Sequence, residues 1–124
     1  RGLHFQKKNP QGKLVTVIKG SAIDVLVDLR QKSKSFGKVH VFHLGDKERN
    51  ILWIPPGFAH GFQALDDDTI FFYKVTAKYE PEDEYSINPL DKTLSITWDS
   101  EIPLILSEKD RNSPSFKDVM ESIL

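Results

Sequence analysis

The sequence has 124 residues, 39% of them hydrophobic and 28% charged, which is ordinary for one globular domain with its own core. The net charge is −1 and Lys and Arg are scattered, so nothing favours nucleic-acid binding, and no apolar run approaches the ~20 residues of a membrane span. The absence of cysteine excludes disulfides and cysteine-bound metals, and it fits a cytoplasmic protein.

The first two thirds of the chain carry repeated β-strand patterns. Residues 13–19 alternate between polar and apolar positions, and 69–76 is rich in aromatic and β-branched residues. Further strand patterns cover 22–29, 39–44 and 50–54. Polar turn residues separate these segments, among them Asn9-Pro10-Gln11-Gly12, Lys19-Gly20-Ser21 and Asp66-Asp67-Asp68. Many short strands with polar turns predict a β-sandwich or a small barrel.

The C-terminal end changes its period. Apolar residues fall on one helical face at Phe116, Val119, Met120 and Ile123. Ser113-Pro114 offers an N-cap serine followed by proline at the first helical position. We therefore predict one domain over 1–124, with the barrel at about 1–98 and a tail with a short helix at 99–124.

Two segments each place a histidine in a strand-and-turn context, Arg1-Gly2-Leu3-His4-Phe5-Gln6 and Pro55-Pro56-Gly57-Phe58-Ala59-His60-Gly61-Phe62. They can be aligned with the two motifs of cupin proteins. The first cupin motif is H-x-H, then a gap, then E, then six residues and G; His4-Phe5-Gln6, Lys13 and Gly20 follow its spacing. The second motif is P-x-G-x-x-H, and Pro55, Gly57 and His60 match it. The sequence thus resembles cupins, which implies an all-β jelly-roll barrel (a double-stranded β-helix) with a short C-terminal helix.

Two of the four metal-ligand positions of the cupin pattern hold Gln6 and Lys13. A charged lysine has three donors and no acceptor, so it repels a divalent cation where glutamate would bind one. His40 and His43 lie on opposite faces of one predicted strand and cannot chelate an ion together. We therefore expect no metal and no other cofactor, and a fixed positive charge where an anion develops during the reaction.

The residues themselves point to histidine chemistry. His4 shares a strand face with Gly2 and Gln6, where it could act as a general base because histidine titrates near neutral pH. A buried histidine satisfied by hydrogen bonds is the structural alternative. Asp24, inside an otherwise apolar strand, could orient such a base or could simply set the strand register. Arg1 has the opposite strand parity, so it reaches the pocket only if Gly2 allows a bend.

The other polar candidates each have an ordinary structural alternative. Lys13 begins a strand and could stabilise an enolate oxygen, although strand ends are also where lysine commonly lies. His60 follows the Pro-Pro-Gly turn and could donate to a keto oxygen or a phosphate of a substrate, or it could only support the turn. Tyr73 shares a face with Phe71 and Val75, where tyrosine is more often core than catalytic.

A longer set of motifs resembles one enzyme family. Arg1-Gly2-Leu3-His4-Phe5-Gln6, Gln11-Gly12-Lys13-Leu14-Val15, residues 52–62 and Phe72-Tyr73-Lys74 resemble the dTDP-4-dehydrorhamnose 3,5-epimerases, which act in making dTDP-rhamnose. The likeness runs from Arg1 to about Asp110. It implies a cytoplasmic isomerase that needs no cofactor, binds a dTDP-linked 4-keto-6-deoxy sugar and forms a homodimer.

The resemblance also implies a role for individual residues. It makes His4 the general base, Asp110 the carboxylate that orients it, Tyr73 the general acid on the opposite side of the sugar, and Lys13 the group that stabilises the enolate. Asp110 lies in a polar stretch, and the sequence without the resemblance would not have selected it. The implied substrate-binding residues, with Tyr79 stacked on the thymine base, are Arg1, Gln6, His60, Tyr79, Glu84 and Lys109.

The implied reaction is epimerisation at C3 and C5 of dTDP-4-dehydro-6-deoxy-D-glucose through an enolate, giving dTDP-4-dehydro-L-rhamnose. Three alternatives stay open: an epimerase for one carbon or for a related nucleotide-linked 4-keto sugar, a metal-dependent cupin oxygenase, and a catalytically silent cupin that binds sugar nucleotides. Gln6 and Lys13 argue against the oxygenase. His4, Asp110 and Tyr73 argue against the silent module.

Some features depart from the family pattern. Family members have Gly directly after the residue that matches Glu84, where this sequence has Tyr85. They have Trp two residues after the residue that matches Ile87, where this sequence has Pro89. They also carry a further segment before the residue matching Arg1, which supplies a strand and nucleotide contacts, partly to the neighbouring subunit. We expect the substitutions to affect substrate range, and we expect a chain without that segment to bind the nucleotide poorly.

Overall fold

The computed structural model describes residues 1–124 and contains eight β-strands, a short 3-10 helix and two α-helices. The strands are β1 (His4–Gln6), β2 (Lys13–Lys19), β3 (Ser21–Asp28), β4 (Val39–Gly45), β5 (Ile51–Ile54), β6 (Phe58–Ala64), β7 (Ile70–Val75) and β8 (Glu84–Ser86). The helices are η1 (Pro81–Asp83), α1 (Glu108–Arg111) and α2 (Phe116–Ser122). None of these helices has the length and apolar character that crossing a membrane requires.

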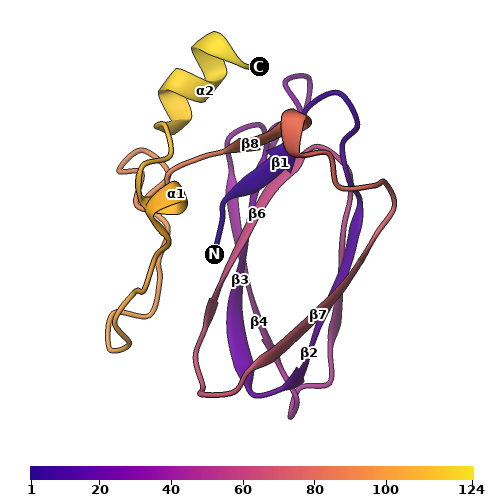
Figure 1. Ribbon diagram of the computed structural model, residues 1–124, viewed down its shortest axis with the longest axis vertical. Helices are drawn as coiled ribbons and strands as arrows, with labels where there is room; N and C mark the ends of the chain where they lie inside the picture. Colours follow the sequence, from indigo (N-terminus) through magenta and orange to yellow (C-terminus); the bar gives the residue numbers. More distant parts are fainter.

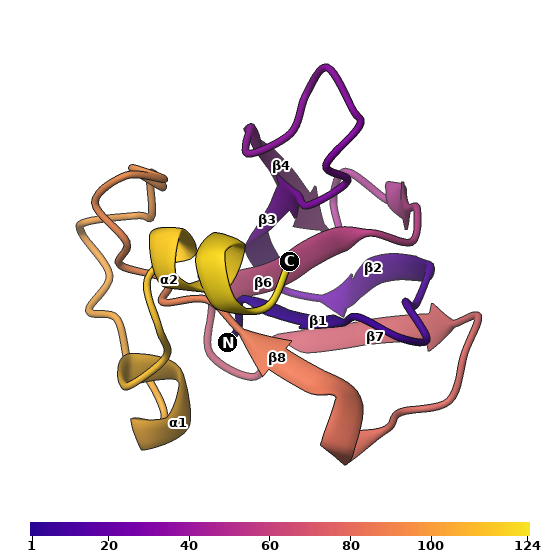
Figure 2. The same cartoon turned by 90° about the horizontal axis from the view of Figure 1, so that it is seen from above.

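The strands form two antiparallel sheets that face each other (Figures 1 and 2). One sheet has the order β4-β3-β6-β1-β8 and the other β5-β2-β7. Because successive side chains alternate between the faces of a strand, each sheet directs one set inward. Val15 and Val17 of β2 meet Ala22 and Leu26 of β3 in a buried cluster between the sheets. These sheets confirm the predicted all-β barrel fold.

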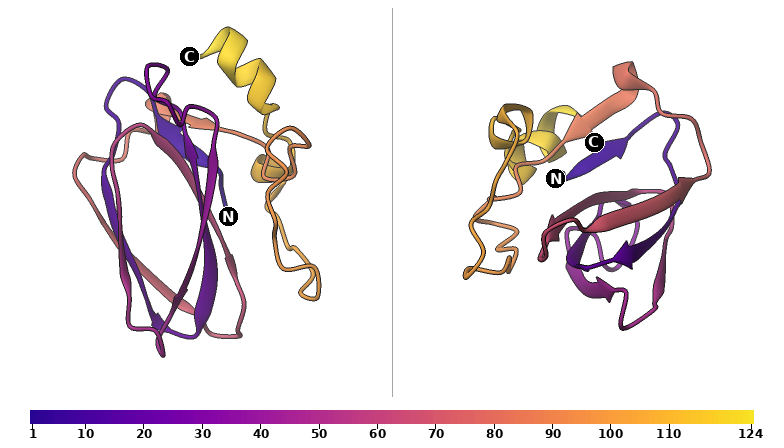
Figure 3. Two further views of the ribbon diagram at one scale, coloured as in Figure 1. Left: turned by 180° about the vertical axis from the view of Figure 1, so that it is seen from behind. Right: turned by 60° about the horizontal axis from the view of Figure 1, so that its bottom comes forward.

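A second core lies on the outer face of the five-stranded sheet. Leu3, Val25 and Val27 point outward from their strands and are covered by helix α2 and by residues between β8 and α1. Figures 1 and 3 show this C-terminal part as a layer beside the barrel. The last strand ends at Ser86, and residues 87–98, which we expected within the barrel, pack against its outside.

Helix α2 begins later than predicted. Its N-cap is Ser115, whose hydroxyl accepts the Asp118 N–H at 3.1 Å while the Asp118 carboxylate accepts the Ser115 N–H. This capping box satisfies two backbone donors at once, so the predicted cap at Ser113 was wrong. The Ser113 hydroxyl instead bonds to Ser86 Oγ and to a backbone carbonyl of α1.

The outer face of the three-stranded sheet has no covering layer. An antiparallel sheet with one solvated face usually carries polar side chains there. Here the outward residues include large apolar side chains that are 40–65% exposed. We call the surface that they form the outer apolar face, and its residues are Leu14, Ile18, Ile51, Trp53, Ile70 and Phe72. A contiguous apolar surface of this kind is typical of a protein contact.

Phe116 anchors helix α2, because its ring is 5% exposed and lies 6.1 Å from the ring of Phe36. Phe116→Ala would leave a cavity, and we expect it to lower the free energy of unfolding by about 3–5 kcal/mol, as measured by urea denaturation at an unchanged m-value. Lys117→Ala, on the exposed neighbouring residue, should change that free energy by less than about 0.5 kcal/mol. Equal effects of the two substitutions would contradict the anchoring role.

Candidate active site

A pocket of about 890 Å³ opens between the two sheets, a size typical of ligand sites. Strands β1 and β6 form one wall, β2 and β7 form the opposite wall, and β8 and helix α1 contribute to the rim. Asp24, the alternative orienting carboxylate, is fully buried and does not line this pocket. The other candidates selected from the sequence all line it: Arg1, His4, Gln6, Lys13, His60, Tyr73, Tyr79, Glu84, Lys109 and Asp110. A smaller groove of about 360 Å³ beside residues 102–106 holds none of them except Arg1.

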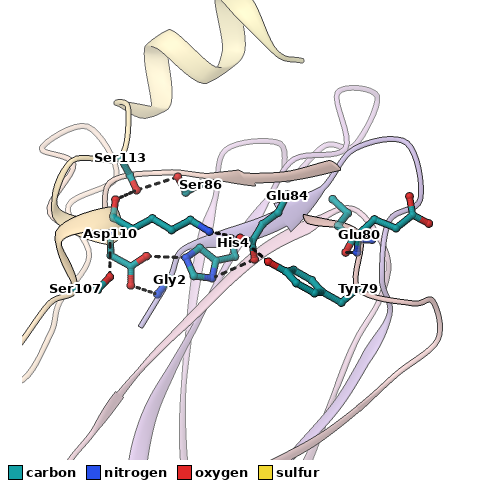
Figure 4. Close-up of polar contacts among 11 residues, drawn as sticks. Gly2, His4, Tyr79, Glu80, Glu84, Ser86, Ser107, Asp110 and Ser113 are labelled. Atoms are coloured by element: carbon teal, nitrogen blue, oxygen red, sulfur yellow. Dashed lines mark hydrogen bonds and ion pairs between the residues drawn. The ribbon is translucent and has the colours of Figure 1, made fainter. Parts of the chain in front are cut away.

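His4 on β1 meets Asp110 on α1 across 106 residues of sequence (Figure 4). His4 Nε2 lies 2.6 Å from Asp110 Oδ1, and the other carboxylate oxygen accepts the Gly2 N–H at 3.1 Å. Ser107 caps the single turn of α1 by accepting the Asp110 N–H, and the turn buries the carboxylate to 3% exposure. Burial alone would raise the pKa of Asp110, but the hydrogen bonds from His4 and Gly2 outweigh it and lower that pKa.

This contact fixes the tautomer of His4. An ionised carboxylate only accepts hydrogen bonds, so the ring nitrogen facing Asp110 carries the proton and Nδ1 keeps its lone pair. Nδ1 lies 3.9 Å from Glu84 Oε1. Glu84 also pairs with Lys109 Nζ and accepts the Tyr79 hydroxyl at 3.3 Å. Burial would raise the pKa of Glu84, but the hydrogen bonds from Lys109 and Tyr79 lower it, so Glu84 is an anion beside Nδ1 of His4.

A second histidine–carboxylate pair lies beside the first. His60 on β6 is the cross-strand neighbour of His4, and its Nε2 lies 2.7 Å from Asp24 Oδ1 on β3. Burial lowers the pKa of His60 by more than the Asp24 carboxylate raises it, so His60 is neutral near pH 7. Each carboxylate thus has its own histidine. Of the two candidates that the sequence left open, Asp110 contacts His4 and Asp24 does not.

Lys13 and Tyr73 project from the three-stranded sheet, on the wall opposite the histidines. Lys13 begins β2, and Tyr73 lies on the neighbouring β7. Burial lowers the pKa of Lys13, and the nearby carboxylates of Asp24 and Glu84 partly offset this effect. The pocket therefore places Lys13 on one wall and His4, with Nδ1 free of any hydrogen bond, on the other.

Arg1 and Gln6 reach the pocket by different means. Gly2 has φ +104°, and a Cβ there would lie 2.6 Å from Gly61 Cα, so glycine permits the bend that brings Arg1 to the pocket. The Gln6 amide donates to two backbone carbonyls and its oxygen accepts the Glu80 N–H. Gln6 therefore holds the loop before η1 and keeps only a second lone pair of its amide oxygen for a ligand, so its substrate-binding role stays a prediction.

Two features of the site were not expected from the sequence. One is the pairing of Asp24 with His60, and the other is the stacking of Phe62 on Phe71, with ring centroids 3.9 Å apart, between the two sheets. Asp24 stood out as a carboxylate in an apolar strand, but nothing local indicated which histidine it contacts. The alternation within 58–64 and 69–76 could have placed both rings on the inner face.

No three His, Cys, Asp or Glu side chains are grouped so that they could hold a metal ion. The carboxylates of the pocket are instead engaged by His4, His60 and Lys109. The expectation of chemistry without a metal stays a prediction.

Sequence comparison identifies relatives along nearly the whole chain. The profile of a family described as dTDP-4-dehydrorhamnose 3,5-epimerase matches residues 1–118. A protein named dTDP-4-dehydrorhamnose 3,5-epimerase from Methanothermobacter thermautotrophicus is 50% identical over 114 residues, which cover 90% of this chain and 62% of the relative.

Solved structures share the fold. The crystal structure of dTDP-4-dehydrorhamnose 3,5-epimerase from Elizabethkingia anophelis has a TM-score of 0.91 and 46% identity, and the match covers 95% of this chain and 66% of that one. ChmJ, a 3'-monoepimerase from Streptomyces bikiniensis solved in complex with dTDP-quinovose, has a TM-score of 0.91 and 31% identity over 98% of this chain and 61% of that one. This chain therefore spans less than two thirds of the length of these relatives.

Asp110→Asn should reverse the tautomer of His4. The Gly2 N–H must keep its acceptor, so the asparagine oxygen would face Gly2 and its NH2 group would face His4 Nε2, which then has to accept. We expect the imidazole proton on Nε2 in the wild type and on Nδ1 in the variant, measured by ¹⁵N–¹H NMR of the side chain. Glu108→Gln, which removes a charge from the same helix, should leave the His4 spectrum unchanged. A wild-type proton on Nδ1 would contradict the assignment.

Proposed function

The chain belongs to the dTDP-4-dehydrorhamnose 3,5-epimerase family, and we propose that it converts dTDP-4-dehydro-6-deoxy-D-glucose to dTDP-4-dehydro-L-rhamnose by epimerisation at C3 and C5. The observation that carries this proposal is the arrangement of the pocket, in which His4, bonded to Asp110 of α1, and Tyr73 come from opposite sheets. Relatives that are 46% and 50% identical bear the name of this enzyme.

The proposed chemistry is proton removal and return beside a ketone. The 4-keto group acidifies the protons on C3 and C5, and His4 takes one of them on Nδ1 while Asp110 stabilises the resulting imidazolium. The ammonium of Lys13 meets the enolate oxygen. Tyr73 returns a proton from the opposite face of the ring, which inverts the carbon. His4 gains one proton and Tyr73 loses one, and exchange with solvent restores both.

We propose that the rim of the pocket binds the nucleotide part of the substrate. Tyr79 is 58% exposed, so its ring is available to stack on thymine. Arg1 and Lys109 supply positive charge for the diphosphate. His60 and Glu84 lie at the sugar. The remote contacts would hold the reacting carbon against the catalytic groups, which is how binding energy away from the reaction accelerates it.

Epimerisation at a single carbon is the second candidate. It is favoured by the likeness to ChmJ, a 3'-monoepimerase with a TM-score of 0.91 to this chain. A base, an enolate-stabilising cation and an acid serve one carbon as well as two, so the pocket chemistry fits both reactions. The decisive difference is which carbon exchanges its proton.

Deuterium exchange tests the proposal. The protein is incubated with dTDP-4-dehydro-6-deoxy-D-glucose in D₂O, and NMR follows deuterium at C3 and C5. We expect incorporation at both carbons, slowed by about 10²–10⁴-fold in His4→Ala because the general base is gone. Incorporation at one carbon would assign the monoepimerase reaction. Bound substrate without exchange at either carbon would contradict both candidates.

The same experiment with Tyr73→Phe separates the acid from the base. His4 could still remove a proton and return a deuteron on its own side, so incorporation should continue while the yield of inverted sugar falls. Lys74→Ala is the control, because Lys74 follows Tyr73 on β7 but is exposed and does not line the pocket. Unchanged formation of inverted sugar in Tyr73→Phe would remove Tyr73 as the acid.

We also propose that the protein is a homodimer joined through the outer apolar face. Pairing two copies there would remove these side chains from water. Ile51 is 65% exposed on this face, so Ile51→Glu should fold but place like charges together across a two-fold contact. Sedimentation equilibrium should then find dimers for the wild type and for Lys47→Glu, and monomers for Ile51→Glu. A monomeric wild type would overturn the proposal. The cytoplasmic location stays a prediction.

A further inference from the structure

Asp24 is a carboxylate in a place that disfavours charge. It lies in the middle of β3 between two hydrogen-bonded neighbours, opposite Phe42 of β4 and Phe62 of β6, and it is 0% exposed. The inward residues on either side of it are Ala22 and Leu26, which belong to the buried apolar cluster. Burying a carboxylate among such groups costs free energy unless specific partners compensate.

Asp24 has a single hydrogen-bond partner, which engages only one of its two oxygens. Oδ1 lies 2.7 Å from His60 Nε2, whereas Oδ2 is buried and has no hydrogen-bond partner. No other buried side-chain oxygen or nitrogen in the protein lacks one. An apolar residue would avoid this cost but would take away the hydrogen-bond partner of His60, and an asparagine would remove the charge but leave amide N–H groups without a partner.

We propose that Asp24 is a positioning residue with two effects: it holds His60 as the tautomer with its proton on Nε2, and its free oxygen supplies the negative charge that holds Lys13 as an ammonium. The second effect bears on catalysis only through the function proposed above. Both effects can be observed in the protein without turnover.

The first effect reverses the role expected for His60. Asp24 only accepts, so His60 Nε2 must donate, and in the neutral ring Nδ1 is then an acceptor. Nδ1 of His60 makes no hydrogen bond. Asp24 Oδ2 is the one buried side-chain nitrogen or oxygen without a partner, so Nδ1 of His60 is not buried, and it is accessible from the pocket that His60 lines. His60 would therefore accept a hydrogen bond from a sugar hydroxyl. Donation to the enolate oxygen is left to Lys13.

The second effect follows from the position of Asp24. Lys13 and His60 line the same pocket, Asp24 is bonded to His60, and its Oδ2 has no other partner. In agreement with this geometry, burial lowers the pKa of Lys13, whereas the carboxylates of Asp24 and Glu84 raise it. Loss of the Asp24 charge would therefore lower this pKa further, and the ammonium would be lost at a lower pH. The titratable and charged groups that line the same pocket are Arg1, His4, His60, Tyr73, Tyr79, Glu84, Lys109 and Asp110.

Two substitutions separate the effects. In Asp24→Asn the oxygen can stay on His60 while the NH2 group takes the place of the unbonded Oδ2, so the tautomer is kept and the charge is lost. Asp24→Leu removes both the acceptor and the charge. Asp28→Asn is the matched control, because Asp28 is equally buried on the same strand but is bonded to Arg30 outside the pocket.

The test uses NMR titration of the labelled protein, with ¹⁵N detection of His60 and of Lys13 Nζ. In Asp24→Asn we expect His60 to keep its proton on Nε2 and the titration of Lys13 to move to lower pH. In Asp24→Leu we expect both tautomers of His60 as well as the Lys13 shift, and in Asp28→Asn neither change. Where the leucine variant fails to fold, the wild type and the asparagine variant still decide. A wild-type His60 proton on Nδ1, or an unmoved Lys13 titration in Asp24→Asn, would overturn the proposal.

Activity provides the link to catalysis. The alkaline limb of the kcat/KM profile should move to lower pH in Asp24→Asn and stay in place in Asp28→Asn. A moved Lys13 titration with an unmoved kcat/KM limb would keep the role of Asp24 and contradict the proposed role of Lys13 at the enolate.

Discussion

The hydrogen bond between His4 and Asp110 is the contact on which the site depends. It joins the first strand to a helix that follows the last strand, and the same carboxylate accepts the Gly2 N–H. Helix α1 has only four residues and could not persist by its own propensity. Its position comes from these long-range contacts, together with the ion pair between Lys109 and Glu84. The dyad therefore orders one rim of the pocket as well as the base.

Each carboxylate at the pocket contacts a basic side chain. Asp110 and Asp24 each contact one histidine, and Glu84 contacts Lys109 while facing the free nitrogen of His4. Burial disfavours every one of these charges, and each partner offsets part of that cost. Two cations of the pocket differ, since no hydrogen bond or ion pair engages the ammonium of Lys13 or the guanidinium of Arg1. An unengaged cation in a pocket is suited to a negative charge that forms only during the reaction.

The strands could be predicted because local signals agreed. Residues 13–19 form β2 as expected, since the alternating pattern and the flanking glycines at 12 and 20 both marked the same bounds. Strand β8 and helix α1 carried no such pattern, because pairing with β1 and the buried Asp110 hold them in place. A contact across 106 residues cannot be read from local sequence, and the resemblance to a family supplied Asp110 where periodicity did not. The pairing of Asp24 with His60 was missed for the same reason.

Two facing sheets provide what inversion at carbon requires. A base and an acid must approach one carbon from opposite sides, and residues on a single strand face cannot do so because they all point the same way. Here His4 belongs to the five-stranded sheet and Tyr73 to the three-stranded sheet, and both point inward. Lys13 stands on the same sheet as Tyr73, at a position where cupins carry a metal-binding glutamate. In the function proposed above, this fixed cation would stabilise the enolate where other cupins bind a metal, and the two facing sheets would let the proton return on the opposite face.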